Sequence, residues 1–493
     1  MTVLAHRVDT VTRDALAVLQ PGFEGTTAPA WLLRQVHEGL TAVGLFGRNI
    51  ASAEQLAALT AQLRTERDDV LVAIDEEGGD VTRLEVRGGS SFPGNLALGA
   101  VDDTALTRDV ARELGRRLAE CGVNLNWAPS ADVNSNPGNP VIGVRSFGAD
   151  THLTARHTAA YVEGLQAAGV AACTKHFPGH GDTNVDSHHA LPRIDVDLET
   201  LQARELVPFK AAIAAGTKAV MSAHILVPSL DPTRPATLSP QILTGLLRKE
   251  LGYEGLIVTD GMEMNAIAGT YGIERGSVLA IAAGADAICV GGGLADEGTV
   301  LRLRDALVAA VREGTLPEER LADAAARVRA LAEWTRLARP DARPEGSRAS
   351  GIGLTAARRA VTVTGSAPAP SAPYVATLAP VANIAVGDET PWGVAAELAA
   401  LLPGTEAGVY PEGAPAEDIL AAAGDRTVVA VVRDEHRHPW MAEIVNALIS
   451  ARPDTVVVEM GLPMAAPRGS LYVATHGASR VCGRAAAEVI AGA

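Results

Sequence analysis

The segment from residue 175 to residue 189 concentrates chemically active side chains in a stretch that is too irregular for a helix. It reads KHFPGHGDTNVDSHH and holds four histidines, two aspartates and one lysine. Its proline and two glycines predict a long loop. Histidine and aspartate are common metal ligands, but the segment lacks the fixed H-x-x-x-H spacing of a helical zinc site. We therefore expect no metal in this loop.

A general acid/base pair is the chemistry that the loop favours. An aspartate that accepts a hydrogen bond from one imidazole nitrogen fixes the tautomer and raises the basicity of the other nitrogen, which suits proton transfer near neutral pH. Asp186 and His188 are predicted to form such a pair. For His180 and Asp182 we favour a structural role, with hydrogen bonds to the loop itself.

Asp260 is the candidate for the matching nucleophile. It closes the apolar run at residues 256–258 and precedes Gly261, so its carboxylate can project into a site without crowding. Bond exchange at an acetal carbon needs an anionic nucleophile and a proton donor on opposite sides of the leaving bond. Asp260 and His188 meet that need. Glu263 is a competing carboxylate, but it lies outside the predicted strand.

Eight short apolar runs provide the framework that positions these residues. They lie at residues 16–19, 42–46, 70–74, 123–127, 170–173, 219–221, 256–258 and 287–290. Amphipathic stretches alternate with them, which predicts right-handed β-α-β units and a parallel sheet. Eight such units in about 300 residues predict a (β/α)8 TIM-like barrel. An open doubly wound sheet would give the same local pattern.

Five of the apolar runs lead directly into polar residues. These are Asp75, Asp132, Lys175 with His176, His224, and Asp260. Polar groups gathered at the C-terminal ends of several strands are how a barrel builds a site. Each of them alone is equally explained by a strand end that meets solvent, but the five together favour a site.

The pattern changes after a helical stretch at residues 318–337. We predict a catalytic barrel at residues 1–337, a linker rich in proline and charge at 338–350, and a smaller α/β three-layer domain at 351–493. Strands are expected near 361–364, 384–386, 428–432, 455–459 and 471–475, in an open and mainly parallel sheet. No G-x-G-x-x-G follows a strand, so a dinucleotide role is not supported. Two roles stay open for the segment 434–438, which follows a strand: a border of the active site that selects the aglycone, and a solvated loop tip. We favour the solvated loop tip there and at Asp388 and Glu389.

Composition excludes several classes of partner. The formal net charge is −16, which argues against nucleic acid and anionic membranes, since both need a basic surface. The four cysteines are scattered without a C-x-x-C pair, which is typical of reduced thiols and favours a cytoplasmic protein. We expect no signal peptide and no membrane span, because no apolar run reaches about 18 residues.

Four motifs together resemble glycoside hydrolase family 3, specifically its β-N-acetylglucosaminidase branch. They are IDEEGG at residues 74–79 with Arg83, NPVIGVRSFG at 139–148, KHFPGHGDT at 175–183 running to DSH at 186–188, and TDGM at 259–262. They occur in the family's order across most of residues 10–335. The sequence departs from the family at Glu76, where Gln is usual, and at Trp127 and Ser130.

The resemblance implies a role for each matching residue. Asp260 would be the nucleophile that forms a covalent glycosyl-enzyme, with His188 as acid/base and Asp186 as its partner. The residues implied to hold the sugar's hydroxyls and ring substituents are Asp75, Arg83, Arg145, Lys175 and His176. The chemistry requires neither a cofactor nor a metal.

The resemblance also implies an activity. We expect a retaining, exo-acting β-N-acetylglucosaminidase that removes terminal β-linked GlcNAc from small glycosides such as muropeptide or chitooligosaccharide fragments. A β-N-acetylglucosaminide or β-glucoside phosphorylase is one alternative, because a neutral imidazole repels inorganic phosphate less than a Glu acid/base would. A broad β-glucosidase is another alternative. An inactive sugar-binding protein is the alternative outside enzymes, but it would have no need for Asp260, Asp186 and His188 together.

Overall fold

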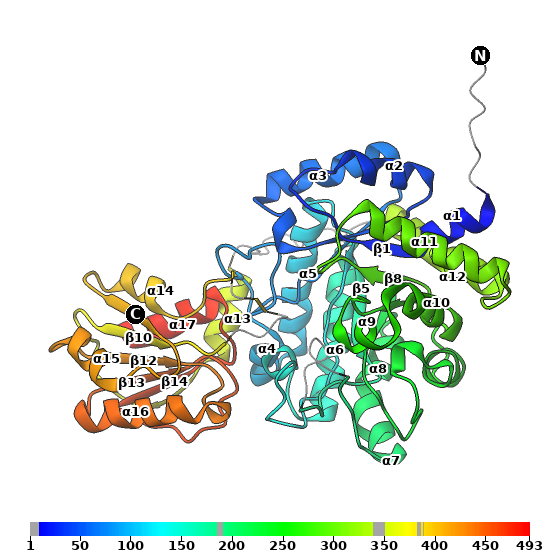
Figure 1. Cartoon of the computed structure of the whole chain (residues 1–493). Coiled ribbons are helices and arrows are strands. Elements are labelled where there is room, and N and C mark those ends of the chain that lie inside the picture. Colours follow the sequence, from blue (N-terminus) through cyan, green and yellow to red (C-terminus); the bar gives the residue numbers. More distant parts are fainter. Residues whose placement is uncertain (1–8, 185–190, 339–350, 382–385, 388) are drawn as a thin grey trace.

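A computed structural model describes residues 9–184, 191–338, 351–381, 386–387 and 389–493. The predicted acid/base pair, Asp186 and His188, lies outside the described residues, as does most of the predicted linker. Figure 1 shows two α/β bodies, one coloured blue to green and a smaller one coloured yellow to red.

Eight parallel strands form the larger body, which confirms the predicted barrel. They are β1 (Leu19–Pro21), β2 (Ala42–Leu45), β3 (Leu71–Ile74), β4 (Leu125–Asn126), β5 (Ala171–Phe177), β6 (Ala219–Ser222), β7 (Leu256–Thr259) and β8 (Ile288–Val290). Strands β2 to β7 are hydrogen-bonded in sequence order, and β1 pairs with β8. A parallel bridge between Val258 and Ala287 links β7 to the start of β8. The sheet therefore curls in the order of the chain, as a barrel requires.

Helices follow the strands and cover the outside of the curled sheet (Figure 1). The α-helices are α1 (Thr10–Ala17), α2 (Ala30–Glu38), α3 (Ala53–Glu66), α4 (Asn95–Val101), α5 (Thr104–Glu120), α6 (Thr151–Ala167), α7 (Leu198–Thr200), α8 (Leu206–Ala214), α9 (Asn265–Tyr271), α10 (Ile273–Ala283), α11 (Glu297–Arg312) and α12 (Glu318–Leu337). The shorter 3-10 turns are η1 (Gly47–Asn49), η2 (Gly143–Arg145) and η4 (Ala236–Leu238), and the π-helices are η3 (Leu201–Glu205) and η5 (Gln241–Glu250).

The first apolar run differs from its prediction. Residues 16–17 end helix α1, and only Leu19 of the run belongs to strand β1. The Asp9 side chain accepts a hydrogen bond from the backbone N–H of Thr12 at 2.8 Å and so starts the helix early. A short apolar run can be buried equally well as a helix or as a strand, so hydrophobic periodicity alone did not distinguish the two.

The inside of the barrel is filled by small and medium apolar side chains. The strand residues of this core are Ala42, Leu71, Ala73, Leu125, Ala171, Cys173, Ala219, Met221, Leu256, Val258, Ala287 and Cys289. Trp127 and Phe46 cap this layer at the C-terminal ends of the strands, with ring centroids 6.4 Å apart. The strand ends therefore open above a packed floor, as in a closed barrel core.

The smaller body, which we call the second domain, is a six-stranded sheet with helices on both faces (Figure 1). It agrees with the predicted three-layer, mainly parallel α/β domain, although Asp388 and most of the predicted strand at 384–386 lie outside the described residues. Its strands run in the order β11 (Glu406–Tyr410), β10 (Tyr374–Leu378), β12 (Val428–Val432), β13 (Val456–Glu459), β14 (Leu471–Ala474) and β9 (Thr362–Gly365). All neighbours are parallel except β14 and β9. Its helices are α13 (Ile352–Ala360), α14 (Ala395–Leu401), α15 (Ala416–Ala423), α16 (Pro439–Ala451) and α17 (Arg480–Ala491), with the 3-10 turn η6 (Glu435–Arg437).

Separate apolar cores cover the two faces of this sheet. Residues of α13, α14 and α17 pack on one face, and residues of α15 and α16 pack on the other. Strands β10 and β11 were not predicted. Strand β11 lacks a buried face, since none of its residues is buried, so its hydrophobic pattern carried no signal.

The two bodies are in direct contact. Helix α13 lies against α4 and α5, where Arg359 pairs with Asp103 at 2.8 Å. Gly353 of α13 sits so close to the Ser91 backbone that an added Cβ would lie 2.0 Å from the Ser91 carbonyl oxygen. Within the described ranges, no helix is both long enough and apolar enough to cross a membrane.

Candidate active site

A cavity of about 680 Å³ lies at the C-terminal ends of the barrel strands. The predicted residues that line it are Asp75, Arg83, Arg145, Lys175, His176 and Asp260. The second domain also reaches the cavity, through Val386, Gly387 and Glu389. The structure thus brings together every predicted site residue that lies within the described ranges.

A dense ionic cluster forms one wall. Asp75, directly after β3, pairs with the Lys175 ammonium from β5, and Lys175 Nζ also lies 2.7 Å from Glu77 Oε1. Arg145 Nη2 lies 2.7 Å from the same Glu77 oxygen. Burial alone would raise the pKa of Glu77, but Arg145 and Lys175 hold that pKa far below its usual range. Glu77 therefore stays ionised and fixes both cations, a role that the sequence analysis missed.

His176 is fixed by a second buried carboxylate. Its Nδ1 lies 2.7 Å from Asp132 Oδ2, and Asp132 is fully buried after β4. Its Nε2 faces Arg145 Nη2 at 3.3 Å. Burial would raise the pKa of Asp132, but the His176 ring and its hydrogen bonds lower that pKa. Asp132 thus orients His176 toward the cavity, and Ser130 supports it with a hydroxyl 3.0 Å from Oδ2.

The predicted hydrogen bonds between the His180 side chain and its own loop are not found among the described residues. The His180 backbone N–H donates to Asp132 Oδ1 at 2.7 Å, but neither ring nitrogen has a partner among the described residues. Burial lowers the pKa of this imidazole to about 4, so the ring is neutral at pH 7. The ring lines the cavity edge-on to His176, with centroids 5.9 Å apart. Asp182 does hold the loop in place, through a 2.7 Å contact with Arg204.

Glu76 lies behind the wall and organises the turn that carries Arg83. Its Oε2 accepts hydrogen bonds from the hydroxyl of Thr82 at 3.0 Å and from the backbone N–H groups of Arg83 and Leu84 at 2.8 Å each. Burial raises the pKa of Glu76 to about 7. Arg83 Nη2 then lies 3.7 Å from Asp75 Oδ2. The family usually has Gln where this chain has Glu76. Because Glu76 holds the turn that carries Arg83 and does not line the cavity, this difference leaves the cavity surface unchanged.

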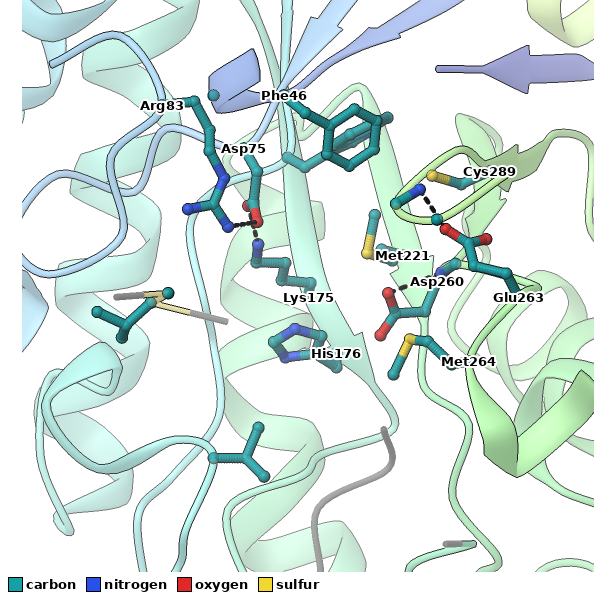
Figure 2. Close-up of a pocket in the computed structure, with 18 of the residues that line it drawn as sticks. Phe46, Asp75, Arg83, Lys175, His176, Met221, Asp260, Glu263, Met264 and Cys289 are labelled. Atoms are coloured by element: carbon teal, nitrogen blue, oxygen red, sulfur yellow. Dashed lines mark hydrogen bonds and ion pairs between the residues drawn. The ribbon is translucent and has the colours of Figure 1, made fainter. Parts of the chain in front are cut away.

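Asp260 occupies the opposite wall. Figure 2 shows Asp260 and Glu263 across the cavity from Asp75, Arg83 and Lys175. Asp260 Oδ1 accepts a hydrogen bond from the Gly261 N–H at 2.8 Å. His224, the other strand-end residue, supports this turn through a 3.0 Å contact between its Nε2 and the Gly261 carbonyl.

Glu263 is engaged by the turn after β8. Its Oε1 accepts hydrogen bonds from the backbone N–H of Gly291 at 3.0 Å and from that of Gly292. These two hydrogen bonds hold one oxygen of the Glu263 carboxylate against the turn after β8. Phe46, Trp127, Met221 and Met264 complete the lining with apolar surface.

The segment 434–438 does not line the cavity, and its interpretation as a solvated loop is wrong. Glu435 is 3% exposed and pairs with Arg468. His436 Nε2 lies 2.8 Å from the carbonyl oxygen of Pro137 in the barrel. The segment thus belongs to the contact between the two bodies, whereas Glu389 is exposed at the mouth of the cavity.

Sequence comparison identifies the family. The profile of the glycosyl hydrolase family 3 N-terminal domain matches residues 26–331. The chain belongs to glycosyl hydrolase family 3. Its motifs at 74–79, 139–148 and 175–183 supply Asp75, Arg145, Lys175 and His176 to the cavity lining described above.

Several relatives are β-hexosaminidases. Beta-hexosaminidase A of Pseudoalteromonas piscicida is 37% identical over 312 residues, which cover 58% of this chain and 52% of the relative. The chain thus spans about half the length of that protein. A Beta-hexosaminidase of Xylella fastidiosa is 38% identical over 281 residues, covering 55% of this chain and 82% of the relative.

Solved structures extend the similarity to the second domain. A glycoside hydrolase family 3 β-N-acetylglucosaminidase from Paenibacillus sp. str. FPU-7 has a TM-score of 0.87 at 35% identity, covering 98% of this chain and 97% of that one. NagZ from Neisseria gonorrhoeae, in complex with N-trifluoroacetyl-D-glucosamine, has a TM-score of 0.57 at 29% identity and covers 70% of this chain.

Proposed function

We propose that this protein is an exo-acting, retaining β-N-acetylglucosaminidase that releases terminal β-linked GlcNAc from small glycosides. The observation that carries the proposal is the cavity in which Asp260 faces a wall of fixed donors and acceptors. Asp75, Arg83, Lys175 and His176 present carboxylate, guanidinium, ammonium and imidazole groups, which suit the hydroxyls of a sugar. The β-hexosaminidase relatives and the Paenibacillus structure support the choice of GlcNAc.

The proposed first step is attack by the Asp260 carboxylate on the anomeric carbon. The bond from that carbon to the aglycone oxygen breaks as His188 delivers a proton to the departing oxygen, and a covalent glycosyl-Asp260 forms. Asp186 fixes the tautomer of His188. In the second step water attacks the anomeric carbon, His188 takes the water's proton, and the Asp260 carboxylate is released with free GlcNAc.

The wall opposite Asp260 positions the sugar in this mechanism. Glu77 and Asp132 lock Lys175, Arg145 and His176, so these groups need little reorganisation when a sugar binds. Arg145 acts in part through His176, which it contacts at 3.3 Å.

The division of the chain is part of the proposal. We assign residues 1–337 to the catalytic barrel, 338–350 to a linker and 351–493 to a C-terminal α/β domain. The family profile ends at residue 331, and the second sheet begins with β9 at Thr362, which supports these bounds. A cytoplasmic location also remains a proposal, supported by four buried, unpaired cysteines.

Turnover of 4-nitrophenyl β-N-acetylglucosaminide and of the matching β-glucoside, with and without inorganic phosphate, tests the activity. Free GlcNAc released at a rate indifferent to phosphate is the expected result. A phosphate-dependent rate with GlcNAc 1-phosphate as product would replace water with phosphate as the second-step acceptor. Preference for the glucoside would indicate a broad β-glucosidase, and turnover of neither substrate would indicate a sugar-binding protein.

A further inference from the structure

Asp80 lies in the loop between the two sugar-wall residues Asp75 and Arg83, yet both of its carboxylate oxygens bond to the second domain. Arg433 Nη2, just after β12, lies 2.5 Å from Asp80 Oδ2. The backbone N–H of Ala478, between β14 and α17, donates to Asp80 Oδ1 at 2.7 Å. The family profile ends at residue 331, so both contacts come from outside the matched region.

This ion pair is shielded and rigid. The Asp80 side chain is 2% exposed and that of Arg433 is 13% exposed. The Arg433 guanidinium also lies over the Trp392 ring, 5.6 Å from the ring centroid, which restricts its movement further. Removing Arg433 leaves Asp80 as a buried carboxylate whose pKa burial raises, so the carboxylate takes up a proton or the loop moves, and either change alters the contact that holds the loop.

The loop that carries Arg145 is held from the same side. Leu462 of the second domain packs against Val144 and Leu96 of the barrel, and His436 Nε2 lies 2.8 Å from the Pro137 carbonyl oxygen. The second domain therefore contacts the two loops that bring Arg83 and Arg145 to the cavity wall, although Arg433, Leu462 and His436 do not line the cavity themselves.

From these contacts we infer that Arg433 is a positioning residue for sugar binding, which acts through Asp80 on the loop that carries Asp75 and Arg83. The second domain thereby sets the geometry of the sugar wall in addition to bordering the cavity mouth. This inference rests on the proposed function, because it takes Asp75 and Arg83 to be the groups that bind the sugar. Small displacements of such groups are costly, since binding groups contribute fully only in the correct geometry.

The test compares Arg433→Met with Arg359→Met in the full-length protein. Both substitutions remove an arginine that pairs with a barrel aspartate, but the Arg359–Asp103 pair joins α13 to the residue that caps α5, and neither residue lines the cavity. We expect Arg433→Met to raise KM for 4-nitrophenyl β-N-acetylglucosaminide and the inhibition constant of GlcNAc by about 10-fold or more, with a smaller change in kcat. Arg359→Met is expected to leave both constants unchanged.

Two conservative variants keep the test decisive if Arg433→Met does not fold. Arg433→Lys retains the charge, and Asp80→Asn retains an acceptor for Ala478, so each should raise both constants by an intermediate factor. Wild-type constants in all folded Arg433 and Asp80 variants would overturn the inference, as would an equal increase in Arg359→Met. Failure of the proposed function is distinct from either outcome, because then the wild-type protein itself would not turn over the GlcNAc substrate.

Discussion

Both sheets of this protein collect polar residues at the C-terminal ends of their strands, yet among the described residues only the strand-end groups of the barrel line the cavity. In the barrel, the acidic and basic groups that follow the strands face one another across a cavity, with Asp260 on one wall and Asp75 and Lys175 on the other. In the second domain, Glu459 ends β13 and accepts hydrogen bonds from the backbone N–H groups of Asp434, Glu435 and Gly461 at 2.6–3.2 Å.

The difference lies in what satisfies the polar groups. The C-terminal edge of a parallel sheet collects polar residues in both domains, because the chain leaves every strand at that edge. At Glu459, backbone N–H groups of two neighbouring loops donate to both carboxylate oxygens. This carboxyl group therefore holds the two loops together and offers no free oxygen to a ligand. Around Asp75 the partners are other charged side chains that border a cavity, and a polar ligand can reach them.

Replacement of Asp260 by Ala should have the largest effect. Without the nucleophile, kcat for 4-nitrophenyl β-N-acetylglucosaminide is expected to fall by about 10⁴-fold or more, as for other enzymes that lose a covalent nucleophile. Glu459→Gln is the matched control, since it changes a strand-end carboxylate of the other sheet and should leave kcat unchanged. Undiminished turnover by folded Asp260→Ala protein would remove Asp260 from the mechanism.

Replacement of Lys175 by Met should show that the barrel cluster also supports the fold. The Lys175 side chain is 3% exposed and contacts both Asp75 and Glu77. Its loss leaves an excess of negative charge in this cluster, which Arg145 and Arg83 offset only in part. We expect the free energy of unfolding to fall by about 3–5 kcal/mol, measured by urea titration at pH 7. The exposed pair of Arg336 and Glu333 is the control, and Arg336→Met should cost less than about 1 kcal/mol. If both variants lost the same unfolding free energy, the buried cluster at Lys175 would stabilise the fold no more than an exposed ion pair does.

The titration of Glu459 should make the unfolding free energy depend on pH. Burial raises the pKa of Glu459 from its ordinary 4.5 to about 8. The folded state therefore binds the proton more tightly than the unfolded state, and this contribution is complete below pH 4.5 and is lost as the pH rises through 8.

The variant Glu459→Gln isolates that contribution. Relative to Glu459→Gln, the wild-type protein should lose roughly 4 kcal/mol of unfolding free energy between pH 5 and pH 9, as measured by urea unfolding at several pH values. Parallel pH curves for the two proteins would show that Glu459 titrates normally, and that its hydrogen bonds outweigh the effect of burial.

The smallest effect is expected at His180. Both ring nitrogens are buried without a partner among the described residues, so Phe at this position removes an unsatisfied polar group while it keeps an aromatic ring. We expect His180→Phe to raise the unfolding free energy by about 1 kcal/mol, visible as a higher Tm. His157, also buried, bonds Thr107 and Asp102 through its two nitrogens, so His157→Phe should lower Tm instead. A lower Tm in both variants would mean that the His180 ring makes polar contacts after all.

Local sequence was sufficient for the framework and for part of the wall. Asp75, Lys175, His176 and Asp260 each follow an apolar run, and parallel strands deliver such residues to one edge whatever else the chain does. The long helices α5 and α6 were equally predictable, because one apolar face repeats along each of them and Asp103 and Asp150 cap their first turns.

Other features depended on packing between residues that are distant in the chain. Nothing near Glu77 indicates that it binds Arg145 and Lys175, because the attraction arises only where burial removes water from all three side chains. Strand β11 has no apolar pattern and exists through its pairing with β10. The ion pair between Asp80 and Arg433 could likewise not be predicted, because the two residues are far apart in the sequence and meet only in the folded chain. Periodicity and strand ends are local properties that the residues carry with them, whereas the strength of an ion pair depends on distance and solvent exposure, which only the folded chain defines.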